Sequence, residues 1–446
     1  MRNQVPATVE AVWCLLNQES PTYLVGGALR DLIRGVPPHD WDLATALTPD
    51  MVEAIGVQAG YRVIPTGKAF GTMTWITEEG PLEVTTFRRD GRYRDGRHPE
   101  RVRFAETIDE DLSRRDFTMN AMAMTVDGIL TDPYQGIRDL AAGRIMTVGD
   151  PQARFNEDPL RMLRAVRFVG LDAKSKPQRL DPLVFETIQR LKTRILNVSR
   201  ERQRDEIMKI FTAPHCGEAL RALDATGVLG VIWPEWVATR NFSQRSPYHS
   251  LPVHQHLLQT ASGGHTPLLR LVGLLHDIAK PSCFWVARDG VGHFYEHEQV
   301  GAEYARDMLM RLAWDRATID RVVLLIRLHM FPWDEAGDRA IRHLLREYGD
   351  EVVGQMLDLR RMDIRGTGRV WEQESGVRQR VLELQTHYPV ADRALKISGN
   401  DVMQWTGLGP GPEIGRWLRR LKDWVDEDPS RNTPNTLKDY LLRSLS

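Results

Sequence analysis

The stretch of sequence that decides the fold is Thr22-Tyr-Leu-Val-Gly-Gly-Ala-Leu-Arg-Asp31, followed closely by His39-Asp-Trp-Asp-Leu-Ala-Thr45. Asp40 and Asp42 alternate as strand residues do, and side chains at i and i+2 of a strand point to the same face. Two carboxylates held that close repel each other unless a cation lies between them. A pair of Mg²⁺ ions is the usual occupant in phosphoryl transfer. The second segment therefore predicts a strand that carries a magnesium site.

The first segment predicts a phosphate-binding site beside these carboxylates. We expect a strand over residues 23–25 and a helix over residues 28–34, joined by the tight turn Gly26-Gly27. Backbone N–H groups at such a turn bind phosphate oxygens. Arg30 would reach the same anion from the first helical turn. The combination indicates a site for a metal-bound nucleotide, whereas an isolated Asp-x-Asp is more often a solvated loop.

Length and composition allow several domains. The chain has 446 residues, 27% of them charged, so two to four domains are expected. Its 59 lysines and arginines nearly balance 60 acidic residues, and the whole-chain charge does not indicate a nucleic-acid partner. Residues 88–103 are a local exception, because seven arginines surround Tyr93 there. This stretch predicts a solvated loop that is also able to bind phosphate.

The cysteines and the hydropathy pattern indicate a cytoplasmic protein. Cys14, Cys216 and Cys283 lie far apart without Cys-x-x-Cys spacing, which fits a reducing compartment and excludes a thiolate metal cluster. The N-terminus lacks the apolar run and cleavage site of a signal peptide, and no stretch of about 18 apolar residues occurs. We therefore expect no membrane role.

Strand patterns and helix patterns separate along the chain. Up to about residue 145, β-rich segments such as 71–76 and 82–87 lie between helical stretches, which predicts a small α/β or α+β domain. From Asp158 onward helical periodicity dominates. Amphipathic helices are expected at 159–168, 180–191, 202–211 and 218–229. Near the C-terminus, residues 406–415 predict a turn that leads into a basic helix.

A polar cluster in the segment Arg114-Arg-Asp-Phe-Thr-Met-Asn120 suits the other half of a nucleotide site. Guanidinium groups match triphosphate oxygens, whereas carboxylate and amide groups match ribose hydroxyls. A structural knot of salt bridges is the alternative, and the residues alone do not separate the two. The candidate side chains are those of Arg114, Arg115, Asp116 and Asn120.

The segment Glu157-Asp-Pro-Leu-Arg-Met-Leu-Arg-Ala-Val-Arg167 predicts the start of a helix, with an acidic first turn and an early proline. Asp158 and Arg161, at i and i+3, are neighbours on such a helix. They form either a helix salt bridge or a pair that reads a base edge, since a carboxylate accepts from an exocyclic amine and arginine donates to ring atoms. Arg164 continues the same stripe, and Arg167 lies further around the helix.

Together these motifs resemble the class II tRNA nucleotidyltransferase and bacterial poly(A) polymerase family of the DNA polymerase beta superfamily. They follow the family order over about the first 210 residues. The motifs are Gly26-Gly-Ala-Leu-Arg-Asp31, Asp40-Trp-Asp42, Glu83-Val-Thr-Thr-Phe-Arg88, Tyr93-Arg-Asp-Gly-Arg97, Arg114-Arg-Asp-Phe-Thr118, Asp132-Pro133 with Gly136, and Glu157-Asp-x-x-Arg161.

The resemblance implies an α+β fold, with a polymerase-beta-like nucleotidyltransferase head followed by helical parts. The expected parts are a head at 1–145, a nucleobase-recognition neck at 146–240, an HD domain at 241–370 and a tRNA-binding tail at 371–446. Candidates for phosphate contacts in the tail are Arg416, Arg419 and Arg420. The oligomeric state stays open.

The activity that the resemblance implies is addition of CCA to the 3′ end of tRNA from CTP and ATP, without a nucleic-acid template. On that reading Asp40 and Asp42 are catalytic and bind Mg²⁺. Glu83 is either a third carboxylate or structural. The implied nucleotide-binding residues are Gly27 and Arg30 for the triphosphate; Arg114, Arg115, Asp116 and Asn120 for phosphates and ribose; and Asp158 and Arg161, with Arg164 and Arg167 beside them, for the base.

Two related activities are alternatives. The arginine-rich stretch matches a flexible family loop that CC-adding enzymes shorten or lack, so it favours full CCA addition or A addition. Poly(A) polymerase is less favoured, because bacterial enzymes of that kind usually carry a strongly basic C-terminal extension and this chain ends at residues 432–446 without one. A reading from a different class makes a hydrolase of the middle of the chain the main activity.

A set of histidines between residues 249 and 363 resembles the HD phosphohydrolase superfamily. Adjacent His276 and Asp277 on an apolar helix are costly to bury without a partner, and a divalent metal would be one. Imidazoles with carboxylates suit Mn, Fe, Ni, Co or Mg better than a tetrahedral zinc site. The preferred ligands are His256, His276, Asp277 and Asp363, with His297 and His329 as second-metal or phosphate groups and His254 as a competitor of His256. Such a domain implies hydrolysis of phosphomonoesters or 2′,3′-cyclic phosphates, or only an RNA-binding scaffold.

Overall fold

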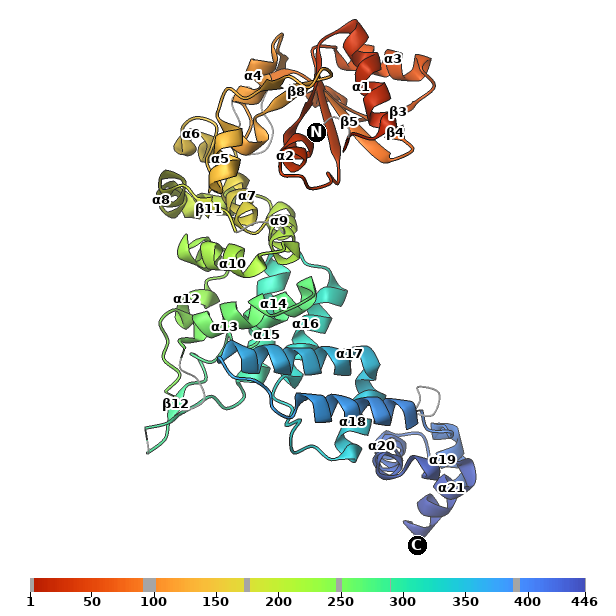
Figure 1. Ribbon diagram of the computed structural model, residues 1–446. Coiled ribbons are helices and arrows are strands. Elements are labelled where there is room, and N and C mark those ends of the chain that lie inside the picture. The colour runs from red at the N-terminus through yellow and green to blue at the C-terminus, as the bar shows by residue number, and fades with distance from the viewer. Residues whose placement is uncertain are drawn as a thin grey trace. The chain divides into compact units, whose positions relative to one another are not determined.

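The structure is a computed structural model of the chain, and it describes residues 4–90, 102–171, 177–245, 251–288, 290–387 and 394–445 (Figure 1). The chain divides into two compact units. The first comprises Met1–Val237 with Arg311–Trp314, and the second comprises Ala238–Met310 with Asp315–Ser446. The finer division into four parts stays a prediction.

A seven-stranded sheet forms the centre of the first unit, in the order β3-β4-β5-β2-β1-β8-β9. Only β2 and β5 run parallel among its neighbouring pairs. Its strands are β1 (Thr22–Val25), β2 (Trp41–Thr45), β3 (Arg62–Gly67), β4 (Thr72–Thr77), β5 (Gly80–Thr86), β8 (Ala123–Thr125) and β9 (Leu130–Thr131). The predicted strands at 23–25, 71–76 and 82–87 correspond to β1, β4 and β5.

The sheet has a hydrophobic core on each face, and neighbouring residues of a strand contribute to different cores because their side chains point to opposite sides. Leu24 and Leu43 belong to a core that also holds Trp13 of helix α1 (Ala7–Glu19) and residues of α2 (Gly26–Ile33) and α3 (Pro49–Gln58). Their neighbours Val25 and Ala44 belong to a second core on the other face. The sheet is therefore a rigid frame for the polar residues at its strand ends.

The rest of the first unit is mainly helical. They are α4 (Ile108–Ser113), α5 (Gly136–Ala142), α6 (Pro151–Glu157), α7 (Leu160–Val169), α8 (Pro182–Leu191), α9 (Arg200–Thr212), α10 (Cys216–Ala225), α11 (Val228–Ile232) and α12 (Glu235–Thr239). Two short strand pairs, β6 (Arg88–Asp90) with β7 (Val102–Phe104) and β10 (Arg144–Ile145) with β11 (Arg179–Leu180), lie between them. Short 3-10 helices are η2 (Lys68–Phe70), η3 (Thr118–Asn120), η4 (Lys192–Asn197) and η6 (Pro429–Arg431), the last of which lies in the second unit.

Three local predictions were wrong. Glu157 and Asp158 are not the acidic first turn of a helix, because Glu157 ends α6 and α7 begins at Leu160. The pair Gly26-Gly27 is not a separate turn, because α2 begins directly at Gly26. The expected helix at 218–229 is broken into α10 and α11, because Gly227 lies between them with a left-handed backbone (φ 78°). All three differences concern where a helix begins or ends, which depends on backbone conformations that periodicity does not specify.

The second unit is helical apart from one hairpin, β12 (Trp285–Val286) with β13 (Gly292–His293), among the residues that the structure describes. Its helices are α13 (Val253–Ser262), α14 (Pro267–Leu275), α15 (His297–Arg311), α16 (Arg316–Leu328), α17 (Asp338–Gly366), α18 (Glu374–His387), α19 (Gly399–Thr406), α20 (Pro412–Glu427) and α21 (Pro434–Arg443). The predicted α+β class is confirmed, with the sheet confined to the N-terminal part.

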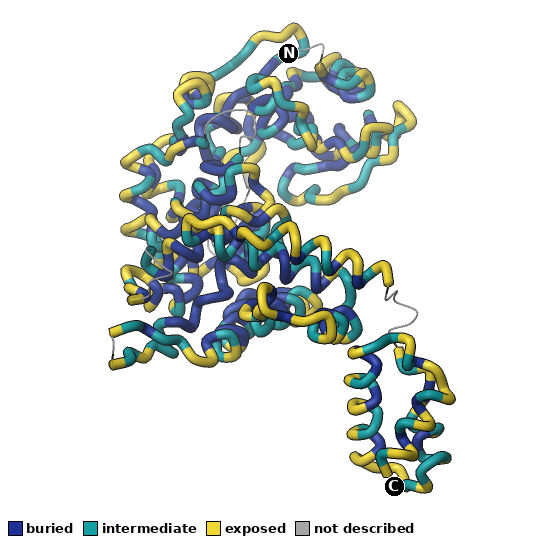
Figure 2. The backbone as a smooth tube through the Cα atoms, turned by 60° about the horizontal axis from the view of Figure 1, so that its bottom comes forward, coloured by how far each residue is buried: buried dark blue, intermediate teal, exposed yellow. Residues whose placement is uncertain are grey.

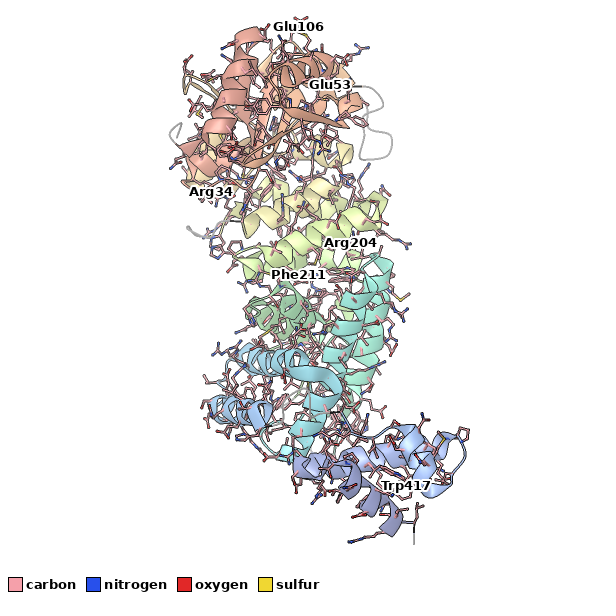
Figure 3. The ribbon with its side chains drawn as sticks, turned by 90° about the vertical axis from the view of Figure 1, so that its right-hand side faces the viewer. Arg34, Glu53, Glu106, Arg204, Phe211 and Trp417 are labelled. Carbon is pink, nitrogen blue, oxygen red and sulfur yellow. The ribbon has the colours of Figure 1, made fainter. Side chains whose placement is uncertain are left out.

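The last three helices have a core of their own, visible as buried segments facing one another in Figure 2. Val402, Leu421 and Leu437 are buried there, and Trp417 of α20, which is labelled in Figure 3, packs against this core. A buried ion pair between Arg346 and Asp426 joins α17 to α20. Within the described residues, no helix combines the length and apolar character needed to cross a membrane.

Candidate functional site

A cavity of about 580 Å³ lies in the first unit, and its walls come from α2, β2, β5, the segment 114–120, α7 and α9. It brings together every nucleotide-site residue that the sequence predicted. These are Gly27, Arg30, Asp40, Asp42, Arg114, Arg115, Asp116, Asn120, Asp158, Arg161, Arg164 and Arg167. Glu83 and Gly26 also line the cavity, together with Phe168 and Arg202, to which the sequence analysis gave no role.

The carboxylates occupy one wall of this cavity. Asp42 lies in β2, with Glu83 of β5 as its register partner across the parallel strand pair, and Asp40 immediately precedes β2. Burial raises the pKa of Asp42 to about 6, with further contributions from Glu83 and Asp40, although Arg115 and Arg30 act in the opposite direction. The negative charge at Asp42 is therefore incompletely compensated, and a divalent cation fits there.

Gly26 allows the start of α2 to approach the carboxylate wall. Its φ of 70° lies in the left-handed region, where a side chain is strained. A Cβ atom there would lie 3.0 Å from Oδ2 of Asp42 and 3.2 Å from Nη1 of Arg115. Backbone N–H groups at the N-terminus of α2 thus line the cavity, where they are suited to binding an anion.

Asp111 in α4 organises the arginine pair of the 114–120 segment. Its fully buried carboxylate accepts from Nη2 of Arg114 at 2.6 Å and from Nη2 of Arg115 at 3.0 Å. Burial favours the neutral acid, but the two guanidinium groups hold the pKa of Asp111 below its usual value. Sequence reasoning missed Asp111, although its i−3 and i−4 spacing from the arginines on a helix was a usable signal. The arginines are therefore both ion-paired and exposed to the cavity.

A chain of hydrogen bonds links α2 to α7 across the cavity floor. Nη1 of Arg30 donates to Oδ1 of Asn120 at 2.9 Å, and the Asn120 amide donates to Oδ1 of Asp116 at 3.0 Å. Arg164 donates to Oδ2 of Asp116 through both Nε, at 2.8 Å, and Nη2, at 2.6 Å. Although burial opposes ionisation, Arg164, Asn120 and Arg161 hold the pKa of Asp116 well below its usual range. Asp116 therefore stays ionised.

Asp158 and Arg161 do not form the helix salt bridge that their spacing allowed. Asp158 lies between α6 and α7, and its Oδ2 accepts from Nη2 of Arg202 at 2.7 Å. Nη1 of Arg161 donates to Oε2 of Glu157 at 2.7 Å, while its Nη2 donates to the Arg114 carbonyl at 3.2 Å. Each side chain is therefore fixed by a different partner, and both border the cavity.

Phe168 is a cavity residue that the sequence gave no reason to select. Its ring centroid lies 5.5 Å from the guanidinium carbon of Arg30, 5.7 Å from that of Arg164 and 4.6 Å from that of Arg167. Arg167 also pairs with buried Glu206 of α9 at 2.7 Å. Three cations thus gather around one aromatic ring, which stabilises positive charge through its electron-rich face.

The histidines of the second unit form two groups that share one carboxylate. Ligand atoms of His256, His276, Asp277 and Asp363 lie within 4.8 Å of one another, and so do those of Asp277, His297 and His329. Oδ2 of Asp277 faces the first group and Oδ1 faces the second. His254, the alternative to His256 as a metal ligand, belongs to neither group, and its Nδ1 accepts from the Asn241 N–H at 3.2 Å.

Backbone carbonyls fix the orientation of three of these rings. Nδ1 of His276, His297 and His329 lies 2.9, 2.7 and 2.6 Å from the carbonyl oxygen three residues earlier, so each Nδ1 carries the proton. The Nε2 lone pairs then point into the cluster. Nε2 of His297 and Nε2 of His329 are only 3.2 Å apart, which is repulsive unless a cation lies between them. The donor set therefore fits divalent metal.

Comparisons with known proteins cover most of the chain. Family models match residues 22–146 as a poly A polymerase head domain, 179–239 as a probable RNA and SrmB-binding site of polymerase A, and 248–366 as an HD domain. A CCA-adding enzyme from Geobacillus sp. (strain WCH70) is 41% identical over 424 residues, which are 94% of this chain and 92% of that enzyme. The match to the CCA-adding enzyme of Geobacillus thermodenitrificans is shorter, at 42% identity over 49% of that enzyme's length.

Two further comparisons extend over nearly the whole length. An A-adding tRNA nucleotidyltransferase from Deinococcus radiodurans is 31% identical over 418 residues, covering 90% of each chain. The crystal structure of the Bacillus stearothermophilus CCA-adding enzyme in complex with CTP has a TM-score of 0.71 and 25% identity to this chain. That match covers 98% of this chain and 97% of the other.

The raised pKa of Asp42 predicts a pH-dependent cost in stability. An acid whose pKa rises on folding destabilises the folded state when ionised, so the cost is full above pH 6 and absent below about pH 4. Without divalent metal, Asp42→Asn should raise the free energy of unfolding by about 2–3 kcal/mol at pH 7.5. Urea denaturation in EDTA at pH 7.5 and at pH 4 measures this gain, which should be absent at pH 4.

The matched control is Asp127→Asn, which replaces an exposed carboxylate and should change the free energy of unfolding little at either pH. An equal gain for Asp42→Asn at pH 7.5 and pH 4 would show that the ionised carboxylate is not its cause.

Proposed function

The chain belongs to the family of CCA-adding enzymes and related tRNA nucleotidyltransferases, and we propose that it adds C and A nucleotides from CTP and ATP to the 3′ end of tRNA. The observation that carries this proposal is the single cavity that holds carboxylates, guanidinium groups and a helix N-terminus together. The reaction joins the tRNA 3′ oxygen to the α-phosphorus and releases pyrophosphate. Synthesis without a template requires that the protein itself selects the base.

The catalytic role falls to Asp40 and Asp42. Nucleotidyltransferases of this class use a divalent metal, and we infer Mg²⁺ here because both side chains are oxygen donors. When bound, the metal would lower the pKa of the 3′ hydroxyl and neutralise the leaving pyrophosphate. The raised pKa of Asp42 supports this role, because a carboxylate that burial destabilises gains most from a bound cation. Glu83 is placed to be a third carboxylate.

The remaining cations and amides of the cavity suit the nucleotide's phosphates and sugar. Arg30 and the N–H groups at Gly27 would bind the triphosphate from α2, while Arg114 and Arg115 would bind it from the opposite segment. Asp116 and Asn120 would accept and donate to ribose hydroxyls. Their existing partners hold these side chains in place before substrate binds, which lowers the ordering cost of binding.

Base selection is assigned to Asp158 and Arg161. On their Watson–Crick edges, cytosine and adenine each present an exocyclic amine next to an accepting ring nitrogen, whereas the corresponding ring nitrogens of uracil and guanine carry a proton. A carboxylate beside a guanidinium therefore complements both correct bases. Arg202 and Glu157 keep the two groups in position, and Arg164 and Arg167 of α7 line the same cavity.

For tRNA we propose contacts along the C-terminal helices. Arg416, Arg419 and Arg420 are exposed on α20 and are candidates for phosphate contacts. A tRNA substrate, together with three free cysteines, points to the cytoplasm. Part of the arginine-rich stretch at 88–103 lies outside the described residues. A-only addition is the alternative, because the Deinococcus relative carries that name.

A second activity is proposed for the second unit, namely metal-dependent hydrolysis of phosphate esters. The shared carboxylate of Asp277 and the facing Nε2 atoms support two divalent metals rather than one. Candidate ions are Ni, Mn, Co, Fe or Mg, since imidazole and carboxylate donors accept each of them. Bound metal would supply an activated water. Lys280, whose ammonium lies 2.6 Å from Oδ2 of Asp277, balances part of the negative charge.

The test of the main activity is incorporation of labelled CTP and ATP into tRNA that lacks its last three, two or one nucleotides. All three substrates should grow to a finished CCA end. Asp40→Asn should abolish synthesis while tRNA binding persists, because only a catalytic carboxylate is lost. Growth of the CC-ended tRNA alone, with ATP, would instead identify an A-adding enzyme, and long A tails on unrelated RNA would identify a poly(A) polymerase.

The base-reading assignment predicts a loss of selectivity. Arg161→Ala should lower the preference for CTP and ATP over UTP and GTP at least tenfold, because a good paired contact contributes about 1–3 kcal/mol of discrimination. Single-turnover incorporation of each nucleotide measures this preference. Glu157→Gln removes the charge opposite Arg161 but keeps an accepting oxygen and the guanidinium, which also donates to the Arg114 carbonyl, so selectivity should persist in this control. Unchanged selectivity in Arg161→Ala would refute the assignment.

The histidine cluster predicts bound metal that specific variants remove. Elemental analysis of purified protein should find about two divalent ions per chain. His276→Ala should remove the ion of the first group and His329→Ala that of the second. His254→Ala should keep the metal content, because its ring lies outside both groups. Protein without metal, after growth with all five candidate metals, would contradict the proposal.

A further inference from the structure

We propose that Trp285, His293 and Tyr295 form a stacking subsite for the base of a nucleotide whose phosphate lies at the histidine cluster. The three aromatic rings belong to the β12–β13 hairpin and the residues that follow it, a segment that projects from the helices of the second unit (Figure 1). The proposal rests on the phosphohydrolase activity inferred above and specifies a nucleotide as its substrate.

The rings share one face of the hairpin. Trp285 and His293 are register partners in the antiparallel pair, so their side chains lie on the same side. Their ring centroids are 5.6 Å apart, and the centroids of His293 and Tyr295 are 5.5 Å apart with an angle of 3° between the planes. The Trp285 and Tyr295 centroids are 6.4 Å apart. The Trp285 ring is tilted by 43° to His293 and by 41° to Tyr295, so the three rings form an aromatic surface of two parallel rings and one tilted ring.

This surface is open to solvent. Tyr295 is 68% exposed and Trp285 is 55% exposed, the largest exposures among the described phenylalanine, tyrosine and tryptophan residues. Exposed apolar patches of this kind are uncommon unless they bind something. Flat aromatic rings favour a nucleobase, because every base has a π-face that stacks on them regardless of sequence.

The opposite face of the hairpin anchors it. The half-buried rings of Phe284 and Phe294 pack with centroids 5.5 Å apart, and Phe242 packs on Phe284 edge to face at 5.1 Å. Gly292 lies so close to the preceding segment that a Cβ atom there would be 2.4 Å from the carbonyl oxygen of Gln244. The hairpin is therefore fixed by its inner face while its outer face carries the exposed rings.

The same anchoring residues connect the hairpin to the proposed metal ligands. The carbonyl oxygen of Phe294 lies 2.7 Å from Nδ1 of His297 and orients that ring. The Lys280 ammonium, which pairs with Asp277, also donates to Oε1 of Gln244 at 3.0 Å. Only Glu296 separates Tyr295 from His297, so the Cα atoms of these two residues are at most about 7 Å apart. The stacking surface and the cluster are therefore neighbours.

This juxtaposition identifies the ligand by its chemistry. Metal ions held by imidazoles and carboxylates would bind a phosphate ester, and an adjacent aromatic surface would bind a flat ring. A nucleoside monophosphate, free or at an RNA end, contains both groups. A peptide or lipid would instead require a larger aliphatic surface, and the exposed rings here are aromatic.

The first experiment compares a substrate that has a base with one that has none. Adenosine 3′-monophosphate and glycerol 2-phosphate are both phosphomonoesters, so they need the same metal chemistry. The double variant Trp285→Ala with Tyr295→Ala should raise KM for adenosine 3′-monophosphate at least tenfold while kcat stays within twofold. KM for glycerol 2-phosphate should stay within twofold, because that substrate has nothing to stack.

Two further variants separate stacking from a structural effect. Tyr295→Phe keeps the ring and should retain the wild-type KM for adenosine 3′-monophosphate. Val370→Ala trims another exposed apolar side chain of the same unit, which is 73% exposed, and should change neither KM. An unchanged KM for the nucleotide in the double variant, or an equal rise for both substrates, would overturn the proposal.

A binding measurement distinguishes failure of the subsite from failure of the hydrolase. Under ultraviolet light, 5-iodouridine 3′-monophosphate should crosslink to the hairpin, as mapped by peptide mass spectrometry, and the double variant should lose this crosslink. Crosslinking without hydrolysis would refute the phosphohydrolase activity and keep the subsite. Hydrolysis without a crosslink to the hairpin would refute the subsite alone.

Discussion

The buried carboxylate of Asp116 is the interaction on which the cavity of the first unit depends. It receives two hydrogen bonds from Arg164 of α7 and one from Asn120, which in turn holds Arg30 of α2. An ionised group is costly to bury unless charged and polar partners surround it. Asp116 has such partners from two separate elements. Their positions are therefore coupled, and the wall that would bind phosphate stays aligned with the wall that would read the base.

The carboxylates of the cavity fall into two classes with different consequences. Asp111 and Asp116 are matched by arginines, which hold their pKa values low and make them structural supports. Asp42 lacks that compensation, and its pKa is raised to about 6. Groups that are unfavourable in the free protein mark places where a ligand contributes missing charge. The contrast separates the positions that build the site from those that would act in it.

Much of the cavity was predictable because its residues occur in short motifs. The spacing of Asp40 with Asp42, and of Arg114 with Asn120, selected side chains that the fold brings to one place. Their supporting partners were not predictable in the same way. Arg202 meets Asp158 across 44 residues of chain, and Glu206 meets Arg167 only because α9 packs on α7. Such contacts depend on tertiary packing, which local spacing does not encode.

The errors in the predicted elements of the fold have a similar origin. Gly26 was expected in a turn because two adjacent glycines usually mark one, yet its left-handed backbone begins a helix directly. The need for glycine at this position is visible only in three dimensions, where Asp42 and Arg115 occupy the space that a side chain would need. In the second unit, sequence reasoning found the six histidine-cluster residues, but it did not reveal that Asp277 stands between two groups.

The shared position of Asp277 makes the histidine cluster fragile over evolutionary time. Each oxygen of this one carboxylate faces a different group, so a replacement at this single residue would disable both proposed metal positions at once. Replacements of the surrounding histidines would affect one position first. A lineage that no longer needs the second activity would therefore lose it abruptly through Asp277 and gradually through the histidines. The cavity of the first unit would be untouched in either case, because none of its lining residues belongs to the cluster.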